Sequence, residues 1–234
     1  MGKAQQSKYS LAKIGILVDL PPAALVRIQR RCSWRGYKPG EPIVNYLDSS
    51  DNVFFITEGE ARVTIYSLSG KAVSFRELSA GEMFGEFPAI DQGPRSASVE
   101  ARTECLVAYM PAAEFLQLLR KEWAVTQALL RKLVMTIRAL TSRVYEFSTL
   151  AVNNRIQAEL LRLANLAPQG GNAARIVPAP THVEIASRVS THREAVTREL
   201  NRLSRMGLIE RRGGTLLVKD LDKLAKMVHE ASGE

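Results

Sequence analysis

The stretch THVEIASRVSTHREAVTRELNRLSR, residues 181–205, decides the fold of the C-terminal part of the chain. It contains the pattern of a helix capping box twice, first as Thr181 with Glu184 and ten residues later as Thr191 with Glu194. Two helix starts so close together leave space for one short helix, a tight turn and a second helix. The sequence therefore predicts a helix-turn-helix.

The second predicted helix has two distinct faces when residues are placed about 100° apart around its axis. Its apolar face consists of Val196, Leu200 and Leu203, which we expect in a hydrophobic core. The polar residues of the opposite face are Glu194, Arg198, Asn201 and Arg205. That second face is free to contact a partner.

The segment after this helix predicts two short strands. Gly207 is a suitable residue to end the helix, and LIERRGGTLLV, residues 208–218, has the pattern of two strands joined at Gly213-Gly214. A helix-turn-helix followed by such a hairpin is a winged helix-turn-helix. Arg211 and Arg212 in the wing would approach the phosphate backbone of DNA.

The polar residues of this module suit double-stranded DNA. Arg193 and Arg198 can each donate two hydrogen bonds to guanine, and Glu194 can accept one from cytosine. The alternative for Arg198 is a solvated surface side chain. The residues predicted to contact DNA are Thr181, Thr191, His192, Arg193, Glu194, Thr197 and Arg198.

Composition and charge exclude several classes of protein. The chain has 234 residues, 46% of them hydrophobic, which excludes a disordered or fibrous chain. No stretch is apolar and long enough for a membrane span or a secretion signal, so we expect a cytoplasmic protein with no membrane partner. The net charge of +8 divides into +1 over residues 1–110, +3 over 111–150 and +4 over 151–234, so the basic excess that suits a polyanion lies in the back half.

The cysteines and histidines do not form the pattern of a metal site. Cys32 and Cys105 are too few for a four-cysteine site, and the three histidines lack metal-ligand spacing. We therefore expect no metal, no catalytic residues and no enzymatic activity.

Residues 53–110 have the pattern of an antiparallel β-domain. VFFI and ARVTIYS are strand-like, and ARVTIYS alternates apolar and polar residues. Turns are expected at Ser69-Gly70 and Ala80-Gly81. The regular spacing predicts a β-roll or barrel, capped by a short helix between Pro22 and Arg31.

A long helix is expected after Pro111, because the 40 residues 112–151 include neither Gly nor Pro. We place it at residues 121–151, a length of roughly 45 Å, which exceeds what one small barrel covers. We therefore expect a parallel homodimer, with packing on its own domain as the alternative. Steps of four and three along the helix form a coiled-coil seam of Leu130, Val134, Ile137, Thr141, Val144, Ser148 and Ala151.

These patterns predict an α+β fold in three parts. Residues 1–119 would form the N-terminal antiparallel β-roll domain, 120–151 the long dimerisation helix, and 152–234 the winged helix-turn-helix domain. The last part begins with the amphipathic helix VNNRIQAELLRLANLA and continues through a loop at 168–180.

One segment of the β-domain combines glycines with polar residues. Gly85-Glu86 is followed nine residues later by Arg95-Ser96-Ala97. This segment resembles the phosphate-binding cassette of cyclic-nucleotide-binding domains. Together with THREAVTREL further along, it makes residues 10–220 resemble the cyclic-AMP receptor, or catabolite activator, family of bacterial transcription regulators.

The resemblance implies a cyclic-nucleotide site in the cassette. Arg95 would pair with the cyclic phosphate, and Ser96 would donate a hydrogen bond to it. The alternative for Arg95 is an ordinary surface side chain paired with a carboxylate. Gly85 would let the ligand approach the backbone, and Glu86 would accept a hydrogen bond from the ribose. The residues implied to bind the ligand are Gly85, Glu86, Phe87, Arg95, Ser96, Ala97, Thr141 and Ser142.

The contacts to the base are where the chain departs from the family. Two hydroxyl side chains of the dimer helix contact adenine in the family, and the resemblance places Leu140 and Thr141 at those positions. Ser142, one residue further, could replace the missing hydroxyl. Thr141 could instead set the register of the seam. Cyclic AMP is therefore the expected effector, and cyclic GMP stays open.

The resemblance also implies a mechanism. Cyclic nucleotide would favour the arrangement of a homodimer whose two recognition helices fit a palindromic operator, about one helical turn or roughly 34 Å apart. RNA polymerase is a further implied partner, through the loop at 169–175. The alternative is a regulator of the same superfamily that binds DNA without cyclic nucleotide or responds to another signal.

Overall fold

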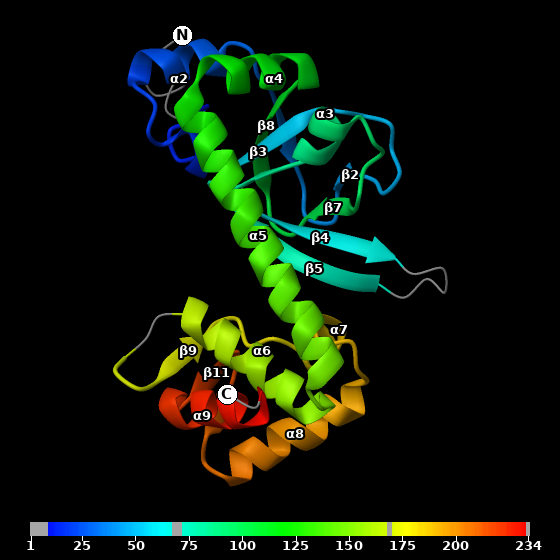
Figure 1. The fold of residues 1–234 in the computed structure, drawn as a ribbon, viewed down its shortest axis with the longest axis vertical. Helices are drawn as coiled ribbons and strands as arrows, with labels where there is room; N and C mark the ends of the chain where they lie inside the picture. Colours follow the sequence, from blue (N-terminus) through cyan, green and yellow to red (C-terminus); the bar gives the residue numbers. More distant parts are fainter. Residues whose placement is uncertain (1–8, 67–71, 168–169, 233–234) are drawn as a thin grey trace. The chain divides into compact units, whose positions relative to one another are not determined.

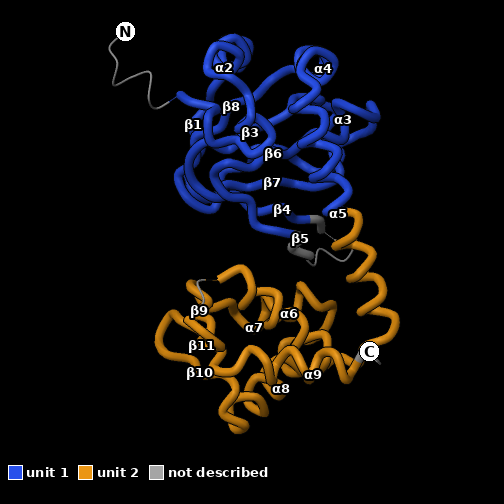
Figure 2. The backbone as a smooth tube through the Cα atoms, turned by 60° about the vertical axis from the view of Figure 1, so that its left-hand side comes forward, with its two compact units in different colours: residues 1–136 blue, residues 137–234 orange. Residues whose placement is uncertain are grey.

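The computed structural model describes residues 9–66, 72–167 and 170–232. The chain divides into two compact units, Met1–Thr136 and Ile137–Glu234, which are coloured separately in Figure 2. Each unit has its own hydrophobic core.

The first unit is built on two antiparallel four-stranded sheets (Figure 1). One sheet has the strand order β1-β8-β3-β6 and the other has the order β2-β7-β4-β5. The strands are β1 (Ser33–Tyr37), β2 (Pro42–Val44), β3 (Val53–Glu58), β4 (Glu60–Tyr66), β5 (Ala72–Ser79), β6 (Met83–Phe84), β7 (Ser98–Ala101) and β8 (Cys105–Met110). The predicted β-roll is confirmed, but it begins 20 residues before Val53, with β1.

Strand β3 is buried on both faces. Val53 and Phe55 belong to a core that includes residues of helices α2 (Pro22–Gln29) and α4 (Ala112–Lys121). The alternate residues Phe54 and Ile56 belong to the core between the two sheets. Because neither face meets solvent, the run VFFI is apolar throughout instead of alternating.

Strand β4 is present but departs from the expected alternation. Its register with β5 shifts between Val63 and Thr64, which is a β-bulge, and Thr64 is buried instead of facing solvent. The turn expected at Ser69-Gly70 lies outside the described residues. The turn expected at Ala80-Gly81 is confirmed, with Gly81 at a φ of 98°.

The expected cap helix is present, and the long helix differs from its predicted range at both ends. Helix α2 is the expected cap, and its Ala24 and Ile28 are buried. The stretch after Pro111 forms two helices instead of one, because Glu122 has extended backbone between α4 and α5 (Trp123–Thr149). The predicted range of 121–151 was therefore two residues too long at each end. The remaining helices of the unit are η1 (Gly15–Leu17) and α3 (Glu86–Asp91).

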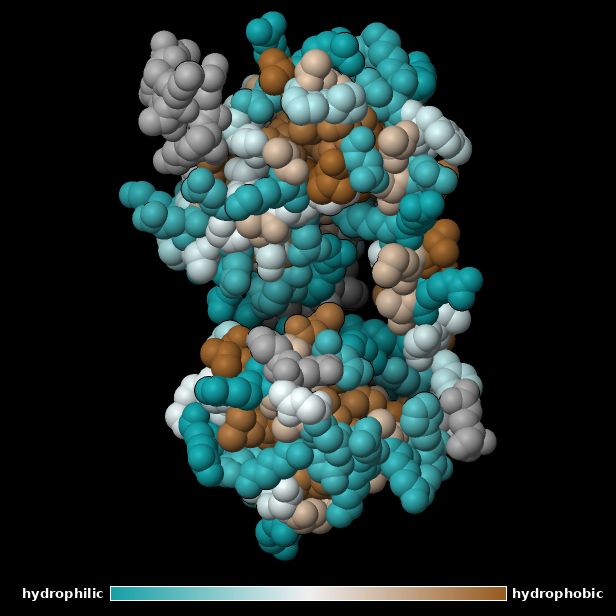
Figure 3. Space-filling model, turned by 90° about the vertical axis from the view of Figure 1, so that its left-hand side faces the viewer, coloured by the Kyte–Doolittle hydropathy of each residue, from teal (hydrophilic) through white to brown (hydrophobic). Residues whose placement is uncertain are grey.

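The predicted seam is exposed along α5. Leu130 and Val134 each have 50% of their surface open to solvent, and Val144 has 65%. Ala151, also placed in the seam, lies outside the helix as the N-cap of α6 (Val152–Leu166). On the face seen in Figure 3, brown apolar side chains reach the surface among the teal hydrophilic ones on both units.

The second unit is a winged helix-turn-helix, as predicted. Its further helices are α7 (His182–Arg188), α8 (Arg193–Arg205) and α9 (Leu221–Ser232), and its sheet has the order β10-β11-β9. Strands β10 (Ile209–Arg212) and β11 (Thr215–Val218) form the expected wing. Strand β9 (Ala174–Ile176), inside the predicted loop, and helix α9 were not predicted.

The two predicted capping boxes have different outcomes. At the start of α7, the Glu184 N–H donates to Thr181 Oγ1 at 3.1 Å and the Thr181 N–H donates to Glu184 Oε2 at 2.9 Å, so this box is confirmed. The box of Thr191 with Glu194 is wrong. His192 is the N-cap of α8, which places Glu194 one position too early to reach back.

Candidate functional site

Arg95 of the cassette is buried, with only 2% of its surface exposed. Its Nε donates to Ser50 Oγ at 3.1 Å. Its Nη1 donates to the Gly85 carbonyl at 3.0 Å, and its Nη2 donates to the Asn52 carbonyl at 2.8 Å. The guanidinium also lies 5.3 Å from the ring centroid of Phe54. Such burial does not fit an ordinary surface arginine.

No carboxylate among the described residues forms an ion pair with Arg95, and the acidic residues that offset its charge do so without such a contact. The three acceptors of Arg95 are neutral oxygens. Burial lowers the pKa of Arg95, while Asp51, Asp48 and Glu86 act in the opposite direction. A buried cation without a contacting counter-ion is costly, so an anionic ligand would stabilise it.

The guanidinium of Arg95 retains donors for such a ligand. It has five N–H groups, of which three are used by the protein acceptors. One N–H remains on each of Nη1 and Nη2, the pair that forms parallel hydrogen bonds to two phosphate oxygens. The residues present therefore fit a singly charged cyclic phosphate.

Gly85 is required by both conformation and space. Its φ is 78°, in the left-handed region. A Cβ at this position would lie 2.6 Å from Arg95 Nη1 and 3.0 Å from the Asn52 carbonyl oxygen. Glu86 follows as the first residue of α3 and is buried, and Phe87 is exposed.

The backbone of the cassette is held by the loop at residues 45–52. The Arg95 N–H donates to the Asp48 carbonyl at 3.0 Å, and the Leu47 N–H donates to the Arg95 carbonyl at the same distance. Ser96, which is exposed, and Ala97, which is half-buried, follow immediately before β7. Sequence reasoning missed this loop, although its polar run LDSSDN was a signal.

Lys132 is a second cation beside the cassette that the sequence did not indicate. It lies on α5, and its Nζ donates to the Met83 carbonyl at 2.7 Å, on the strand that leads directly to Gly85. Burial lowers the pKa of Lys132, and Glu86 acts in the opposite direction. Two cations, Arg95 and Lys132, are thus associated with the cassette.

The two hydroxyl residues expected to contact the base lie on α5. Thr141 and Ser142 are exposed and belong to the second unit, whereas the cassette belongs to the first. Thr141 Oγ1 donates to the Ile137 carbonyl at 3.0 Å, which leaves its lone pairs as acceptors. The cassette residues are brought together, and the roles of Thr141 and Ser142 stay predictions.

Three of the side chains predicted to contact DNA are exposed on helix α8. Arg193, Glu194 and Arg198 are exposed, while Val196 and Leu203 on the other face are fully buried. A groove of about 750 Å³ lies between α8 and the start of α6. Its lining residues are Val152, Asn153, Thr191, His192, Ala195, Arg198, Glu199, Asn201, Arg202 and Arg205.

A buried polar contact fixes the inner side of α8. Gln157 Nε2 donates to Glu199 Oε1 at 2.7 Å, and both side chains are buried. Arg202 Nη2 donates to the same carboxylate oxygen at 2.7 Å. Sequence reasoning missed Glu199, because a charged residue on a helix is expected at the surface.

The two remaining predicted DNA contacts are Thr181, at the start of α7, and Thr197, the fifth residue of α8. Thr181 is the exposed N-cap of α7. Thr197 Oγ1 is hydrogen-bonded to His182 Nδ1 at 2.8 Å. Burial lowers the pKa of His182, and the cations Arg211 and Arg193 shift it in the same direction. This positive surrounding suits a phosphate.

The two wing arginines differ in their contacts. Arg212 is paired with Glu210, which also contacts Lys219, and these two cations lower the pKa of Glu210 to about 2. Arg211 is exposed and forms no ion pair within the described ranges. Of the two, Arg211 has the charge available for a phosphate.

Comparison with known proteins agrees with this division of the chain. Residues 34–122 match the family model of the cyclic nucleotide-binding domain, and residues 154–227 match that of the Crp-like helix-turn-helix domain. A cyclic AMP receptor protein of Thermus thermophilus is 30% identical over 204 residues, which cover 87% of this chain and 88% of the relative.

A second relative and a solved structure are similar over nearly the whole chain. A CRP-like cAMP-activated global transcriptional regulator of Mycobacterium tuberculosis is 25% identical over 217 residues, or 92% of this chain and 97% of the relative. The crystal structure of the Thermus thermophilus catabolite activator protein superimposes with a TM-score of 0.55 at 25% identity, covering 93% of this chain and 99% of the other.

A cyclic-nucleotide-binding domain followed by a winged helix-turn-helix defines a transcription regulator that binds a cyclic nucleotide and DNA. The chain belongs to the Crp family of transcription regulators, which are not enzymes. Among the helices that the structure describes, none is both long and apolar enough to cross a membrane. The same residues contain no group of three or more His, Cys, Asp or Glu side chains that could hold a metal ion.

Proposed function

We propose that this protein is a homodimeric regulator whose binding to a palindromic DNA operator is controlled by cyclic AMP. The observation that carries the proposal is Arg95, a buried guanidinium without a contacting carboxylate and with one N–H left on each terminal nitrogen. A relative named as cAMP-activated and another named a cyclic AMP receptor protein support cyclic AMP as the effector. The protein acts in the cytoplasm, where its DNA is.

The ligand site in this proposal consists of the cassette and the base contacts. Arg95 and Ser96 bind the cyclic phosphate, Gly85 and Ala97 leave room for it, and Glu86 accepts from the ribose hydroxyl. Phe87 borders the ligand. Thr141 and Ser142 contact the base.

The exposed seam of α5 supports a dimer. Leu130, Val134, Ile137 and Val144 are large apolar side chains with half or more of their surface open in a single chain. A second copy of the helix would bury them as a coiled coil. We retain residues 1–119, 120–151 and 152–234 as ligand-binding, dimerisation and DNA-binding parts.

Control of DNA binding then follows from a shift between two arrangements of the dimer. Cyclic AMP binds one arrangement more tightly, and that arrangement presents both α8 helices to major grooves roughly 34 Å apart. The groove residues Thr191, His192 and Arg198, together with Arg193 and Glu194, contact the DNA. Thr181, at the start of α7, and Thr197, on α8, support them.

RNA polymerase is the proposed protein partner. A hollow of about 520 Å³ in the second unit includes Leu166, Arg175 and Val177 in its lining. Leu166 is 82% exposed and Val177 is 66% exposed. Of the expected contact loop at 169–175, Gln169 lies outside the described residues and Ala174 and Arg175 belong to β9. Exposed apolar side chains around a hollow are typical of a protein-binding surface.

Selection of DNA from a random library tests the proposal. The purified full chain should select inverted repeats in the presence of cyclic AMP. Its affinity for the selected duplex, followed by fluorescence anisotropy, should rise on the order of 5- to 150-fold on adding cyclic AMP. Equal affinity with and without nucleotide would instead establish a regulator that needs no ligand. An equal rise with cyclic GMP would contradict selectivity for cyclic AMP.

A further inference from the structure

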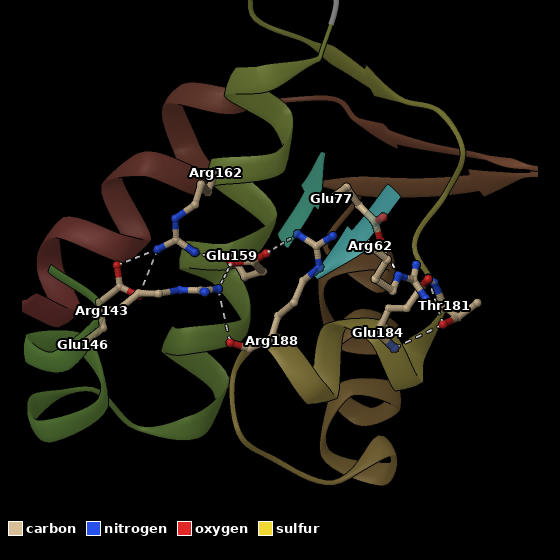
Figure 4. A network of polar contacts seen from close by, with 9 residues as sticks. All are labelled: Arg62, Glu77, Arg143, Glu146, Glu159, Arg162, Thr181, Glu184 and Arg188. Carbon is tan, nitrogen blue, oxygen red and sulfur yellow. Dashed lines mark hydrogen bonds and ion pairs between the residues drawn. The ribbon is translucent and has the colours of Figure 1, made fainter. Parts of the chain in front are cut away.

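The second unit contains one carboxylate that is shared by three arginines. Glu159, on α6, has only 1% of its surface exposed. Its Oε2 accepts from Arg143 Nη2 at 3.2 Å and from Arg162, and its Oε1 accepts from Arg188 Nη1 at 3.3 Å. Figure 4 shows the three guanidiniums converging on this carboxylate. We call Arg143, Glu146, Glu159, Arg162 and Arg188 the Glu159 network.

The members of the Glu159 network come from three helices. Arg143 and Glu146 lie near the end of α5, Glu159 and Arg162 lie on α6, and Arg188 is the last residue of α7. Arg162 also donates both to Glu146 Oε1 at 2.7 Å and to Glu146 Oε2 at 3.0 Å. One buried carboxylate thus connects the long helix to the first helix of the helix-turn-helix.

Arg143 makes a contact that Arg162 does not make. Its Nη2 donates to the backbone carbonyl of Arg188 at 3.3 Å, in addition to Glu159. That carbonyl ends α7, and the turn through Ser190, with its φ of 51°, follows directly before α8. Arg143 therefore holds the backbone at the point where the recognition helix takes its direction.

Arg143 also lies directly after the proposed base contacts in the sequence. Thr141 and Ser142 are exposed, whereas the Arg143 side chain is half-buried against α6 and α7. Consecutive residues on a helix point about 100° apart, so one turn can face a ligand and the Glu159 network together. A rotation or shift of this turn changes both sets of contacts.

We propose that Arg143 is a positioning residue that transmits ligand binding from α5 to the recognition helix through Glu159 and the Arg188 carbonyl. This inference rests on the proposed function, because it needs DNA binding to depend on cyclic nucleotide. A packed ionic contact is well suited to this role, since it is either made or broken and does not deform gradually.

The variant Arg143→Met tests this role with the fold retained. Methionine keeps the aliphatic part of the side chain, and Glu159 remains paired with both Arg162 and Arg188. Removing Glu159 itself would leave buried cations without a partner, a change that is strongly destabilising. The control is Arg162→Met, which removes one guanidinium from the same carboxylate, together with its two hydrogen bonds to Glu146, but removes no contact with α7.

The measurement is the affinity of the full chain for its selected operator with and without cyclic AMP. We expect the rise in DNA affinity on adding cyclic AMP to be at least about fivefold smaller in Arg143→Met than in wild type. In Arg162→Met the same rise should stay within about twofold of the wild-type rise. Cyclic AMP affinity of the DNA-free protein should stay within about threefold, since Arg143 makes no cassette contact. Thermal unfolding monitors the fold of each variant.

Three results would overturn the assignment. If DNA affinity rises on adding cyclic AMP as much in Arg143→Met as in wild type, Arg143 does not transmit ligand binding. An equal loss in both variants shows that any weakening of the Glu159 network is enough, so Arg143 has no particular part. If the DNA affinity of the wild-type protein does not rise on adding cyclic AMP, the proposed function is contradicted, and so is the inference that rests on it.

Discussion

The guanidinium of Arg95 occupies the space into which any side chain on Gly85 would extend. Nη1 of Arg95 donates to the Gly85 carbonyl at 3.0 Å and would lie 2.6 Å from a Cβ on the same residue. The glycine, ten residues earlier in the chain, is thus a condition for the position of the arginine. The two residues form one unit of the proposed anion site.

Gly85→Ala should therefore weaken ligand binding as well as stability. The alanine would be strained at a φ of 78°, at a cost on the order of 1–3 kcal/mol, and its methyl group would displace Arg95. We expect a lower melting temperature and at least about tenfold weaker cyclic AMP binding by calorimetry. Gly170→Ala is the matched control, because a Cβ there meets nothing within 4 Å. Unchanged ligand affinity in Gly85→Ala would contradict this pairing.

Val134→Glu should convert the proposed dimer into monomers. The side chain is 50% exposed in the single chain, so the substitution leaves the fold of the unit intact while placing two carboxylates in the dimer seam. Sedimentation velocity should show a shift from dimer to monomer at micromolar concentration. Ala139→Glu adds the same carboxylate at another exposed position of α5, on the side of the helix opposite the seam. If Val134→Glu remains a dimer, the helices do not pair through this stripe.

Arg198→Ala should relax recognition at one base pair. The exposed guanidinium lines the groove beside α8, and loss of a two-bond contact with guanine costs roughly 1–3 kcal/mol on the specific operator. Binding to a set of single-base operator variants measures the preference at each position. A preference that is unchanged everywhere would remove Arg198 from the reading face.

Arg211→Ala should weaken binding without changing specificity. Arg211 is the exposed wing arginine, while Arg212 is already paired with Glu210. A phosphate contact contributes equally on all sequences, so the slope of log affinity against log salt should fall by about one. The matched control is Arg212→Ala, which we expect to change that slope less. A larger change in the slope for Arg212→Ala than for Arg211→Ala would assign the phosphate contact to Arg212.

The sequence predicted the elements that are stabilised by contacts between residues close together in the chain. The capping box of Thr181 lies within four residues, and the glycines of the wing mark a hairpin between adjacent strands. Strands β1 and β9 had no such signal. β1 pairs with β8 about 70 residues away and β9 pairs with β11, so their conformation depends on partners distant in the sequence.

The polar residues that sequence reasoning missed were missed for the same reason, because their surroundings come from segments distant in the sequence. Ser50, Lys132, Glu159 and Glu199 are ordinary polar residues in the sequence, and only the packing of other segments around them makes them buried or bonded to the site. The capping box expected at Thr191 failed for the opposite reason. Its local pattern was complete, but the helix started one residue later, after His192.

The most direct test of the account is calorimetric titration of the purified protein with cyclic AMP, and separately with cyclic GMP, repeated on Arg95→Leu. We predict one site per chain with a Kd on the order of 1 µM for cyclic AMP, and no measurable binding to Arg95→Leu. Arg102→Leu, at an exposed position a few residues further, should bind as wild type does. Absence of binding by the wild-type protein, or binding that survives in Arg95→Leu, would contradict the central claim that this buried arginine holds a regulatory cyclic nucleotide.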